Sequence, residues 1–261
     1  MTFTNKTIIV TGGGGFFGTC ATARFLSAGC NVACLDISDS ALSAVPEHPK
    51  LLKIPADVTS QSSIDTAVAA TVARFGKIDL LWNNAGYQGA ICPTLSYPVD
   101  DFSRVMNINV TGMFIVLQSV AKSMSTTGGG AIVNTASVAA LRCTPAMVAY
   151  ASSKAAVIAM TNCTAKDLAP NQIRVNAVSP ALIGPGMMWD RQNELHAACD
   201  SPYFANDAVT VAKNKIGGVP MKRIGSVDEV VDAVEFLLSE KASYITGQNI
   251  VVDGGMSAGL K

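Results

Sequence analysis

The sequence predicts a single α/β domain in which helices cover both faces of a doubly wound parallel sheet. Three observations lead to this prediction. Short apolar runs alternate with helix-length segments along all 261 residues. The first apolar run leads directly into four consecutive glycines, Gly12–Gly15. No linker, change of composition or fixed-period repeat divides the chain, so one domain covering residues 1–261 is the simplest organisation.

The first half of the chain contains four short apolar runs that are typical of buried strands. We expect these strands at Lys6–Thr11, Asn31–Asp36, Leu51–Pro55 and Ile78–Trp82. Longer segments with helical patterns lie between or after them. We expect these helices at Phe17–Ala28, Ile64–Phe75 and Asp101–Met124.

The second half repeats the alternation. Ala131–Thr135 is an apolar strand, and the following helix, Val148–Leu168, ends before Pro170. Ile173–Val178 and Asn249–Val252 are further strands, and the helix Val227–Leu238 lies between them.

One long segment, residues 181–218, stands apart from this alternation. It contains glycine and proline as well as several large apolar side chains, including Met187, Trp189 and Phe204. Long insertions in compact domains are usually functional, so we interpret the segment as a substrate lid. The alternative is a surface excursion that is packed by its own side chains.

Composition excludes several classes of function. The net charge is zero, which does not favour binding to nucleic acid or to an anionic membrane. The apolar stretch Val105–Ala121 is short and interrupted by polar residues, unlike a membrane span. The low charge and positive mean hydropathy suggest apolar surface buried between subunits, and thus a homo-oligomer.

Two further features concern the compartment. Met1–Val10 lacks the pattern of a secretory signal. Seven scattered cysteines without a Cys-x-x-Cys pair are typical of free thiols in a reducing compartment rather than of disulfides or a metal site. We therefore expect a cytoplasmic protein without a bound metal.

The glycine run predicts a cofactor site. A strand, a glycine turn and a helix place backbone N–H groups at a helix N-terminus, where they can bind a phosphate. The segment Thr11–Gly18 has this order, and its glycines allow a tight turn and a close approach of the backbone to a pyrophosphate. The alternative, an ordinary flexible turn, does not explain its position between a strand and a helix.

Asp36 ends the next predicted strand, where a carboxylate can accept hydrogen bonds from the ribose of adenosine. A carboxylate in this place also repels a 2′-phosphate, and no Lys or Arg lies between Gly12 and Gly18. The sequence therefore predicts NAD rather than NADP as the cofactor. The alternative is that Asp36 only caps the end of its strand.

Tyr150 and Lys154 are one helical turn apart, so their side chains lie on one helix face. An ammonium beside a phenol favours the phenolate, and we expect Lys154 to lower the pKa of Tyr150 toward working pH. In that state Tyr150 can take a proton from an alcohol or return it to a ketone. Taken alone, the pair is also compatible with an ordinary surface pair.

Polar residues near the ends of other predicted strands strengthen this interpretation. Ser137 and Asn84 follow two of these strands, at the sheet edge where α/β proteins bind ligands. Asn109 lies inside an apolar helix, where an unpaired amide is costly. It is either a satisfied core amide or the holder of a water that passes protons to Lys154.

These motifs, in this order, resemble the short-chain dehydrogenase/reductase family over nearly the whole chain. The resemblance implies a Rossmann-like fold and a catalytic tetrad formed by Asn109, Ser137, Tyr150 and Lys154. It implies dimers or tetramers packed through the helices at Asp101–Met124 and Val148–Leu168. The cofactor-binding residues that it implies, together with the glycine turn, are Gly12, Gly14, Gly15, Phe17, Gly18, Asp36, Asp57, Val58, Asn84, Gly86, Tyr150, Lys154, Pro180 and Ile183.

Three segments, Asn83–Ala90, Tyr97–Phe102 and Gly184–Arg191, are similar to the bacterial NAD-dependent xylitol dehydrogenases within that family. We therefore expect a secondary alcohol or ketone as substrate, such as xylitol, a related sugar alcohol or a cyclic alcohol. Two alternatives are a reductase of acyl or aromatic ketones and a non-catalytic nucleotide-binding protein. The residues expected around the substrate are Gln88, Ser137, Met147, Tyr150, Met187 and Trp189, with Asn193 and Glu194 as further partners for hydroxyl groups.

The sequence departs from the family pattern at two places. Phe16 stands in the turn before the first predicted helix, where the family usually has glycine. Ala181 follows Pro180, where glycine is also usual. Because a Cβ restricts the backbone, these two residues bear on the geometry of the cofactor site.

Overall fold

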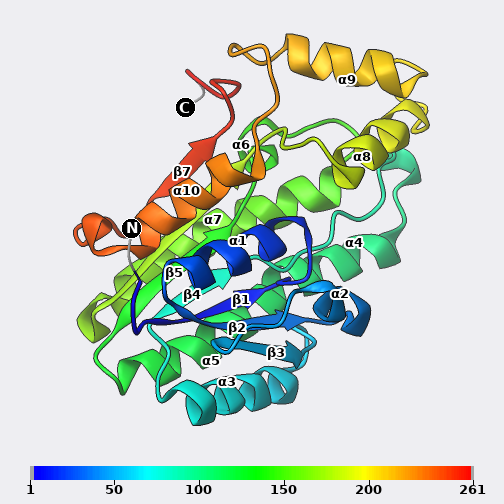
Figure 1. Cartoon of the computed structure of the whole chain (residues 1–261). Coiled ribbons are helices and arrows are strands. Elements are labelled where there is room, and N and C mark those ends of the chain that lie inside the picture. Colours follow the sequence, from blue (N-terminus) through cyan, green and yellow to red (C-terminus); the bar gives the residue numbers. More distant parts are fainter. Residues whose placement is uncertain (1–2, 260–261) are drawn as a thin grey trace.

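A parallel sheet of seven strands forms the centre of the protein (Figure 1). The computed structural model describes residues 3–259. The strands lie in the order β3-β2-β1-β4-β5-β6-β7, and every pair is parallel. Their bounds are β1 Thr7–Thr11, β2 Asn31–Asp36, β3 Leu51–Pro55, β4 Leu80–Asn83, β5 Gly130–Thr135, β6 Ile173–Pro180 and β7 Asn249–Val252.

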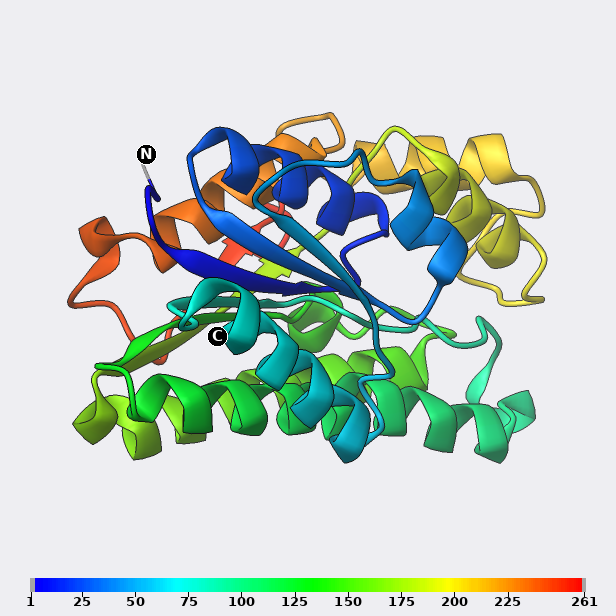
Figure 2. The same ribbon diagram turned by 60° about the horizontal axis from the view of Figure 1, so that its bottom comes forward.

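Helices cover both faces of this sheet, as Figure 2 shows. On one face α1 (Phe16–Ser27) and α10 (Val227–Leu238) pack through a buried cluster that includes Phe25 and Val234. On the other face α3 (Gln61–Phe75), α5 (Met113–Ser125) and α7 (Val148–Leu168) pack through a second cluster that includes Ile64 and Val116. The predicted doubly wound α/β domain is confirmed.

The strand order places one crevice at the centre of the sheet. β1 pairs with β2 on one side and with β4 on the other, so the chain reverses its direction of winding at β1. In open α/β sheets ligands bind outside the carboxyl ends of the strands at this point. The loops after β1, β4, β5 and β6 meet at this edge.

The long helix predicted at Asp101–Met124 is longer and less regular than the sequence suggested. It runs from Val99 to Ser125 as α4 (Val99–Met106), a π-helical segment (Asn107–Gly112) and α5. By length and hydropathy alone the whole helix is compatible with a membrane span, but half of its most apolar window is buried inside the domain. Buried core helices pass the same test, so the helix gives only weak evidence for a membrane.

Four further helices were not predicted. Short helices follow β2 and β5, namely α2 (Asp39–Ala44) and α6 (Ala139–Arg142). The segment 181–218 contains α8 (Met187–Ala197) and α9 (Ala208–Gly217), which pack against each other. This segment therefore contains two packed helices, and it lies beside the carboxyl edge of the sheet (Figure 1).

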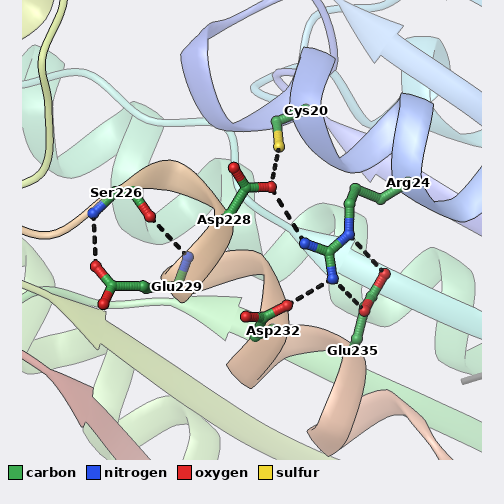
Figure 3. A network of polar contacts seen from close by, with 7 residues as sticks. All are labelled: Cys20, Arg24, Ser226, Asp228, Glu229, Asp232 and Glu235. Carbon is green, nitrogen blue, oxygen red and sulfur yellow. Dashed lines mark hydrogen bonds and ion pairs between the residues drawn. The ribbon is translucent and has the colours of Figure 1, made fainter.

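One arginine joins the helix that follows the glycine turn to its neighbour. The guanidinium of Arg24 in α1 contacts three carboxylates of α10, those of Asp228, Asp232 and Glu235 (Figure 3). It binds Glu235 through two nitrogens, with N···O distances of 3.3 and 2.7 Å. The side chain of Glu235 is only 11% exposed, so this contact is shielded from water. α10 itself begins with a capping box between Ser226 and Glu229.

We expect Arg24→Gln to lower the free energy of unfolding by about 1–3 kcal/mol, because it leaves the nearly buried carboxylate of Glu235 without its charged partner. Urea unfolding followed by circular dichroism measures this change. The matched control is Arg223→Gln, which removes an exposed pair with Glu229 and should have a much smaller effect. Equal losses in the two variants would show that the network does not stabilise the fold.

Candidate active site

The glycine turn follows β1 at the carboxyl edge of the sheet. Gly12 has a φ of +63°, a conformation that favours glycine, and the amide of Gly13 donates to the carbonyl of Leu35 at 2.9 Å. A Cβ at Gly18 would collide with the carbonyl oxygen of Gly12 and with the backbone of Gly13. No side chain caps the N-terminus of α1 at Gly15, so its first N–H groups remain available. This arrangement fits a pyrophosphate of a bound dinucleotide.

The departure at Phe16 does not disturb this turn. Phe16 is the first residue of α1 and is absent from the residues with positive φ, because Gly12 makes the sharp turn instead. Its ring faces the backbone of Gly186 in the 181–218 segment. Ala181 is also accommodated, and its amide donates to the carbonyl of Val252 at 3.1 Å.

Asp36 lies at the end of β2 beside the glycine turn. Its carboxylate accepts hydrogen bonds from the amides of Gly14 and Ser38, both at 3.0 Å. The carboxylate therefore caps the end of the strand, which was the alternative interpretation of the sequence. The contact with Gly14 also places the carboxylate of Asp36 beside the N-terminus of α1, which fits a pyrophosphate. A residue that binds the adenosine ribose must have this position.

The residues predicted to border the adenine occupy the next loop. Asp57 accepts from the amide and the hydroxyl of Thr59 at 2.8 and 2.7 Å, which fixes the turn after β3. Val58 packs against Gly112 of the π-helical segment. The loop after β3 is thus held against the long helix.

Asn84 and Gly86 follow β4 at the carboxyl edge of the sheet. The backbone and side chain of Asn84 donate to Thr11 at 2.9 and 3.2 Å, and its Oδ1 accepts from the hydroxyl of Thr135 at 3.3 Å. Asn84 thereby joins the ends of β1, β4 and β5. A Cβ at Gly86 would lie 3.3 Å from Oδ1 of Asn109 and 3.5 Å from Nζ of Lys154, so glycine keeps space around these groups.

Lys154 is buried at the end of β5. Its Nζ donates to the carbonyl oxygen of Thr135 at 2.7 Å and lies 5.7 Å from the centre of the Tyr150 ring. Desolvation lowers the pKa of Lys154 to about 8. The ammonium is therefore fixed by a strand carbonyl, one helical turn from Tyr150, as the spacing predicted.

Tyr150 faces Ser137, which follows β5. A hydrogen bond with Ser137 lowers the pKa of Tyr150, but burial of the phenol has the larger effect and raises it. The expected lowering of this pKa toward working pH is therefore wrong, because burial has the larger effect. The physical reason is that the ammonium donates to Thr135 and not to the phenol, while the cavity wall removes water from the phenol.

Asn109 lies in the π-helical segment, and its side-chain amide makes three hydrogen bonds. Its Oδ1 accepts from the amide of Tyr87 at 2.7 Å, and its Nδ2 donates to the carbonyl of Tyr87 and the hydroxyl of Ser153 at 2.8 and 3.0 Å. The side chain is thus a satisfied core amide that fixes the loop carrying Gly86 to α7. Such π-helical interruptions are frequent at functional sites.

Ser137 and Tyr150 open onto a cavity of about 420 Å³. Of the residues expected around the substrate, Ser137, Met147 and Tyr150 line this cavity. Of the residues expected around the cofactor, Phe17 and Pro180 line it as well. The remainder of the wall comes from α6, from the 181–218 segment and from the loop after β7, and includes Arg142, Ala181, Gln192, His196, Tyr203, Phe204, Lys215 and Met256.

The other residues expected around the substrate lie behind or outside this wall. Gln88 accepts a hydrogen bond from Gln192 at 3.1 Å, and Asn193 is buried behind the wall. Met187 is 79% exposed and does not line the cavity, because the helix α8 turns its first residue outward. Trp189 packs against Lys215, and Glu194 is exposed. Ile183 pairs with Gly225 next to the cavity.

Sequence reasoning missed Arg142, Gln192, His196 and Lys215. They lie in helices without a recognisable motif. The packing of α8 on α9 brings Gln192, His196 and Lys215 to the cavity, and α6 carries Arg142. For Gln192, His196 and Lys215 the one signal in the sequence was their place in the long segment 181–218. Arg142 lies outside that segment and had no such signal. Among residues 3–259, no group of three or more His, Cys, Asp or Glu side chains is arranged to hold a metal.

Comparisons with known proteins agree with this geometry. A family model described as enoyl-(acyl carrier protein) reductase matches residues 17–257. The chain is 34% identical to levodione reductase of Leifsonia aquatica, over 98% of this chain and 96% of that protein. It is 36% identical to 2-(R)-hydroxypropyl-CoM dehydrogenase of Xanthobacter autotrophicus, over 97% and 99%. A crystal structure of NAD⁺-bound xylitol dehydrogenase has 45% identity and a TM-score of 0.95, covering 98% of this chain and 100% of that one.

Proposed function

Because the chain belongs to the short-chain dehydrogenase/reductase family, we propose that it is an NAD-dependent oxidoreductase of secondary alcohols and ketones. The alcohols that suit it best are polyols such as xylitol, related sugar alcohols and cyclic alcohols. The observation that carries the proposal is that Ser137 and Tyr150 line one cavity, with the buried ammonium of Lys154 fixed next to Tyr150.

Bound NAD supplies the acceptor for the hydride of the alcohol. The protein supplies the proton transfer and the positioning. The hydroxyl of Ser137, which lines the cavity next to Tyr150, orients the substrate oxygen. Tyr150 exchanges a proton with that oxygen, and the buried charge of Lys154 one helical turn away favours the phenolate when the proton arrives from an alcohol.

The glycine turn and Asp36 favour NAD as the cofactor. The free N–H groups at the start of α1 suit the pyrophosphate, and the carboxylate of Asp36 beside Gly14 suits an unmodified ribose. A 2′-phosphate would meet the negative charge of Asp36 at short range. The NAD⁺-bound state of the similar xylitol dehydrogenase supports the same choice.

We expect Asp36→Ala to raise the use of NADP relative to NAD by at least about tenfold, because one repulsive charge near the 2′-phosphate is removed. The measurement is the ratio of kcat/KM for the two cofactors with one alcohol. Asp39→Ala, which removes an exposed carboxylate in the neighbouring helix α2, is the matched control. A wild-type protein that already prefers NADP would contradict this account of Asp36.

The substrate class follows from the wall of the cavity together with the relatives. Gln192 and Ser137 offer hydrogen bonds to hydroxyl groups, and similarity to xylitol dehydrogenase favours polyols. Met147, Phe204 and Met256 form an apolar part of the wall, which favours the second candidate, a reductase of acyl or aromatic ketones. A non-catalytic nucleotide-binding role leaves the arrangement of Ser137, Tyr150 and Lys154 without a use.

A substrate screen separates these functions. Sugar alcohols and cyclic alcohols are supplied with NAD, acyl and aromatic ketones are supplied with NADH, and the absorbance of reduced nicotinamide is followed. We expect oxidation of at least one polyol or cyclic alcohol. Turnover of ketones alone, with indifference to every polyol, would select the reductase, and no turnover at all would select the nucleotide-binding role.

Three further proposals concern the setting of the site. The 181–218 segment acts as a substrate lid, since α8 and α9 supply part of the cavity wall. The chain forms a homotetramer or a homodimer through the helix Val99–Ser125 and α7, where apolar side chains such as Phe114 remain exposed. The protein acts in the cytoplasm, which fits its free cysteines.

A further inference from the structure

The charged residues that line the active-site cavity are all cations. Lys215 from α9 and Arg142 at the end of α6 line it, and none of the lining residues within the described range 3–259 is Asp or Glu. Neither cation forms an ion pair with another residue of that range. A cavity whose wall carries charge of one sign attracts ligands of the opposite sign.

The ammonium of Lys215 is held in place by buried side chains of α8. Its Nζ donates to Oδ1 of Asn193 at 2.8 Å and lies 3.2 Å from Nδ1 of His196. It also lies 5.5 Å from the centre of the Trp189 ring. Asn193 and His196 are only 3% and 1% exposed, so the ammonium has a rigid support. Lys215 therefore has a fixed position in the cavity wall, unlike a mobile surface lysine.

The contacts around Lys215 leave at least one of the ammonium's three N–H donors free. Nδ1 of His196 lies 2.7 Å from the carbonyl oxygen of Gln192 and 3.2 Å from Nζ of Lys215, and the tautomer of the ring decides which of the two it bonds. Burial and the nearby Lys215 lower the pKa of His196 to about 4, so the ring is neutral at neutral pH. Within residues 3–259 the ammonium therefore has at most two side-chain acceptors, Asn193 and His196, for its three N–H donors, and at least one donor remains for a ligand.

This arrangement carries an energetic cost that a neutral ligand does not remove. Burial lowers the pKa of Lys215 to about 8, and no carboxylate in the described part of the chain offsets that loss of hydration. A neutral hydroxyl group can accept a hydrogen bond from the ammonium but leaves its charge without a counter-charge. An anionic group of the ligand restores the favourable surroundings of the ammonium through a charge-assisted hydrogen bond.

We propose that Lys215, assisted by Arg142, binds a carboxylate of the substrate, so that the preferred alcohol is a polyhydroxy acid rather than the neutral polyol. The inference rests on the proposed function, because Tyr150 and Ser137 must hold the reacting hydroxyl in the same cavity. Asn193 and His196 are positioning residues that set the ammonium in place.

The test compares two alcohols with the same five-carbon skeleton, xylitol and its aldonic acid, as substrates with NAD. For the wild-type protein we expect the acid to have the higher kcat/KM. Lys215→Met should lower kcat/KM for the acid about 10–100-fold more than it lowers kcat/KM for xylitol. Lys215→Arg should retain most of the preference, and Lys213→Met, an exposed lysine of the same helix, should retain all of it.

A binding measurement keeps this test independent of turnover. The Kd of the aldonic acid for the protein–NADH complex is measured by calorimetry for the wild type and Lys215→Met, after circular dichroism has verified folding. We expect weaker binding in the variant by the same 10–100-fold. Equal Kd values, no binding to the wild type, an equal loss for both alcohols or a preference for xylitol would overturn the inference. Failure to oxidise any alcohol, with the difference in Kd preserved, would overturn only the proposed function.

Discussion

Replacing Tyr150 with phenylalanine is expected to lower kcat/KM for alcohol oxidation at least about 1,000-fold. The change removes one hydroxyl group, the one that faces Ser137 at the start of α7. Without it the site loses the group that we propose takes the alcohol proton, while the glycine turn and Asp36 are untouched. The Kd for NAD, measured by fluorescence titration, should therefore stay within about threefold of the wild-type value.

The matched control for this variant is Tyr244→Phe. Tyr244 is fully exposed, outside the cavity, and loses the same hydroxyl group. We expect wild-type kinetics in this control. Turnover retained in Tyr150→Phe would contradict the role of Tyr150, and a large loss of NAD affinity would show that the residue acts through cofactor binding instead.

Lys154→Met should produce the second largest effect, a loss of about 100- to 10,000-fold in kcat/KM. The variant fills a similar volume but removes the ammonium that is fixed by Thr135 at the centre of the crevice. Steady-state kinetics with NAD and one alcohol measure the loss. Lys166→Met, on an exposed position of the same helix, is the control and should behave like the wild type.

The pH dependence distinguishes an electrostatic role of Lys154 from a structural one. Burial raises the pKa of Tyr150, so oxidation, which needs a deprotonated phenol, should accelerate as pH rises, and reduction should be favoured at lower pH. Loss of the nearby positive charge destabilises the phenolate further, so the oxidation profile of Lys154→Met should move to higher pH. A variant with reduced activity but an unchanged profile would contradict the electrostatic role.

Much of the fold was predictable because it is encoded locally. Apolar runs such as Asn31–Asp36 are strands by their length and composition, and the predicted bounds of β2, β3, α7 and α10 agree with the structure. The π-helical segment at Asn107–Gly112 was not predictable in the same way. It depends on the contacts of Asn109 with Tyr87 and Ser153, which are distant in the sequence.

The candidate site also contains residues that the local sequence predicts and residues that depend on contacts distant in the sequence. Ser137, Tyr150 and Lys154 could be proposed from the sequence because they lie at motif spacings next to strand ends. The cations Arg142 and Lys215 could not, since nothing in their local sequence marks them and only the packing of α6, α8 and α9 brings them to the cavity. The pKa of Tyr150 was predicted with the wrong direction because spacing reveals a neighbouring charge but not the loss of water around the phenol.

The central claim is that the cavity around Tyr150 is a place of direct hydride transfer, and an isotope experiment tests it most directly. The best alcohol from the screen, deuterated at its carbinol carbon, is incubated with NAD and the wild-type protein. NMR of the recovered cofactor should show the deuterium on the nicotinamide ring, and Tyr150→Phe should give none over the same time. Deuterium released into water, or equal transfer by both proteins, would contradict the account.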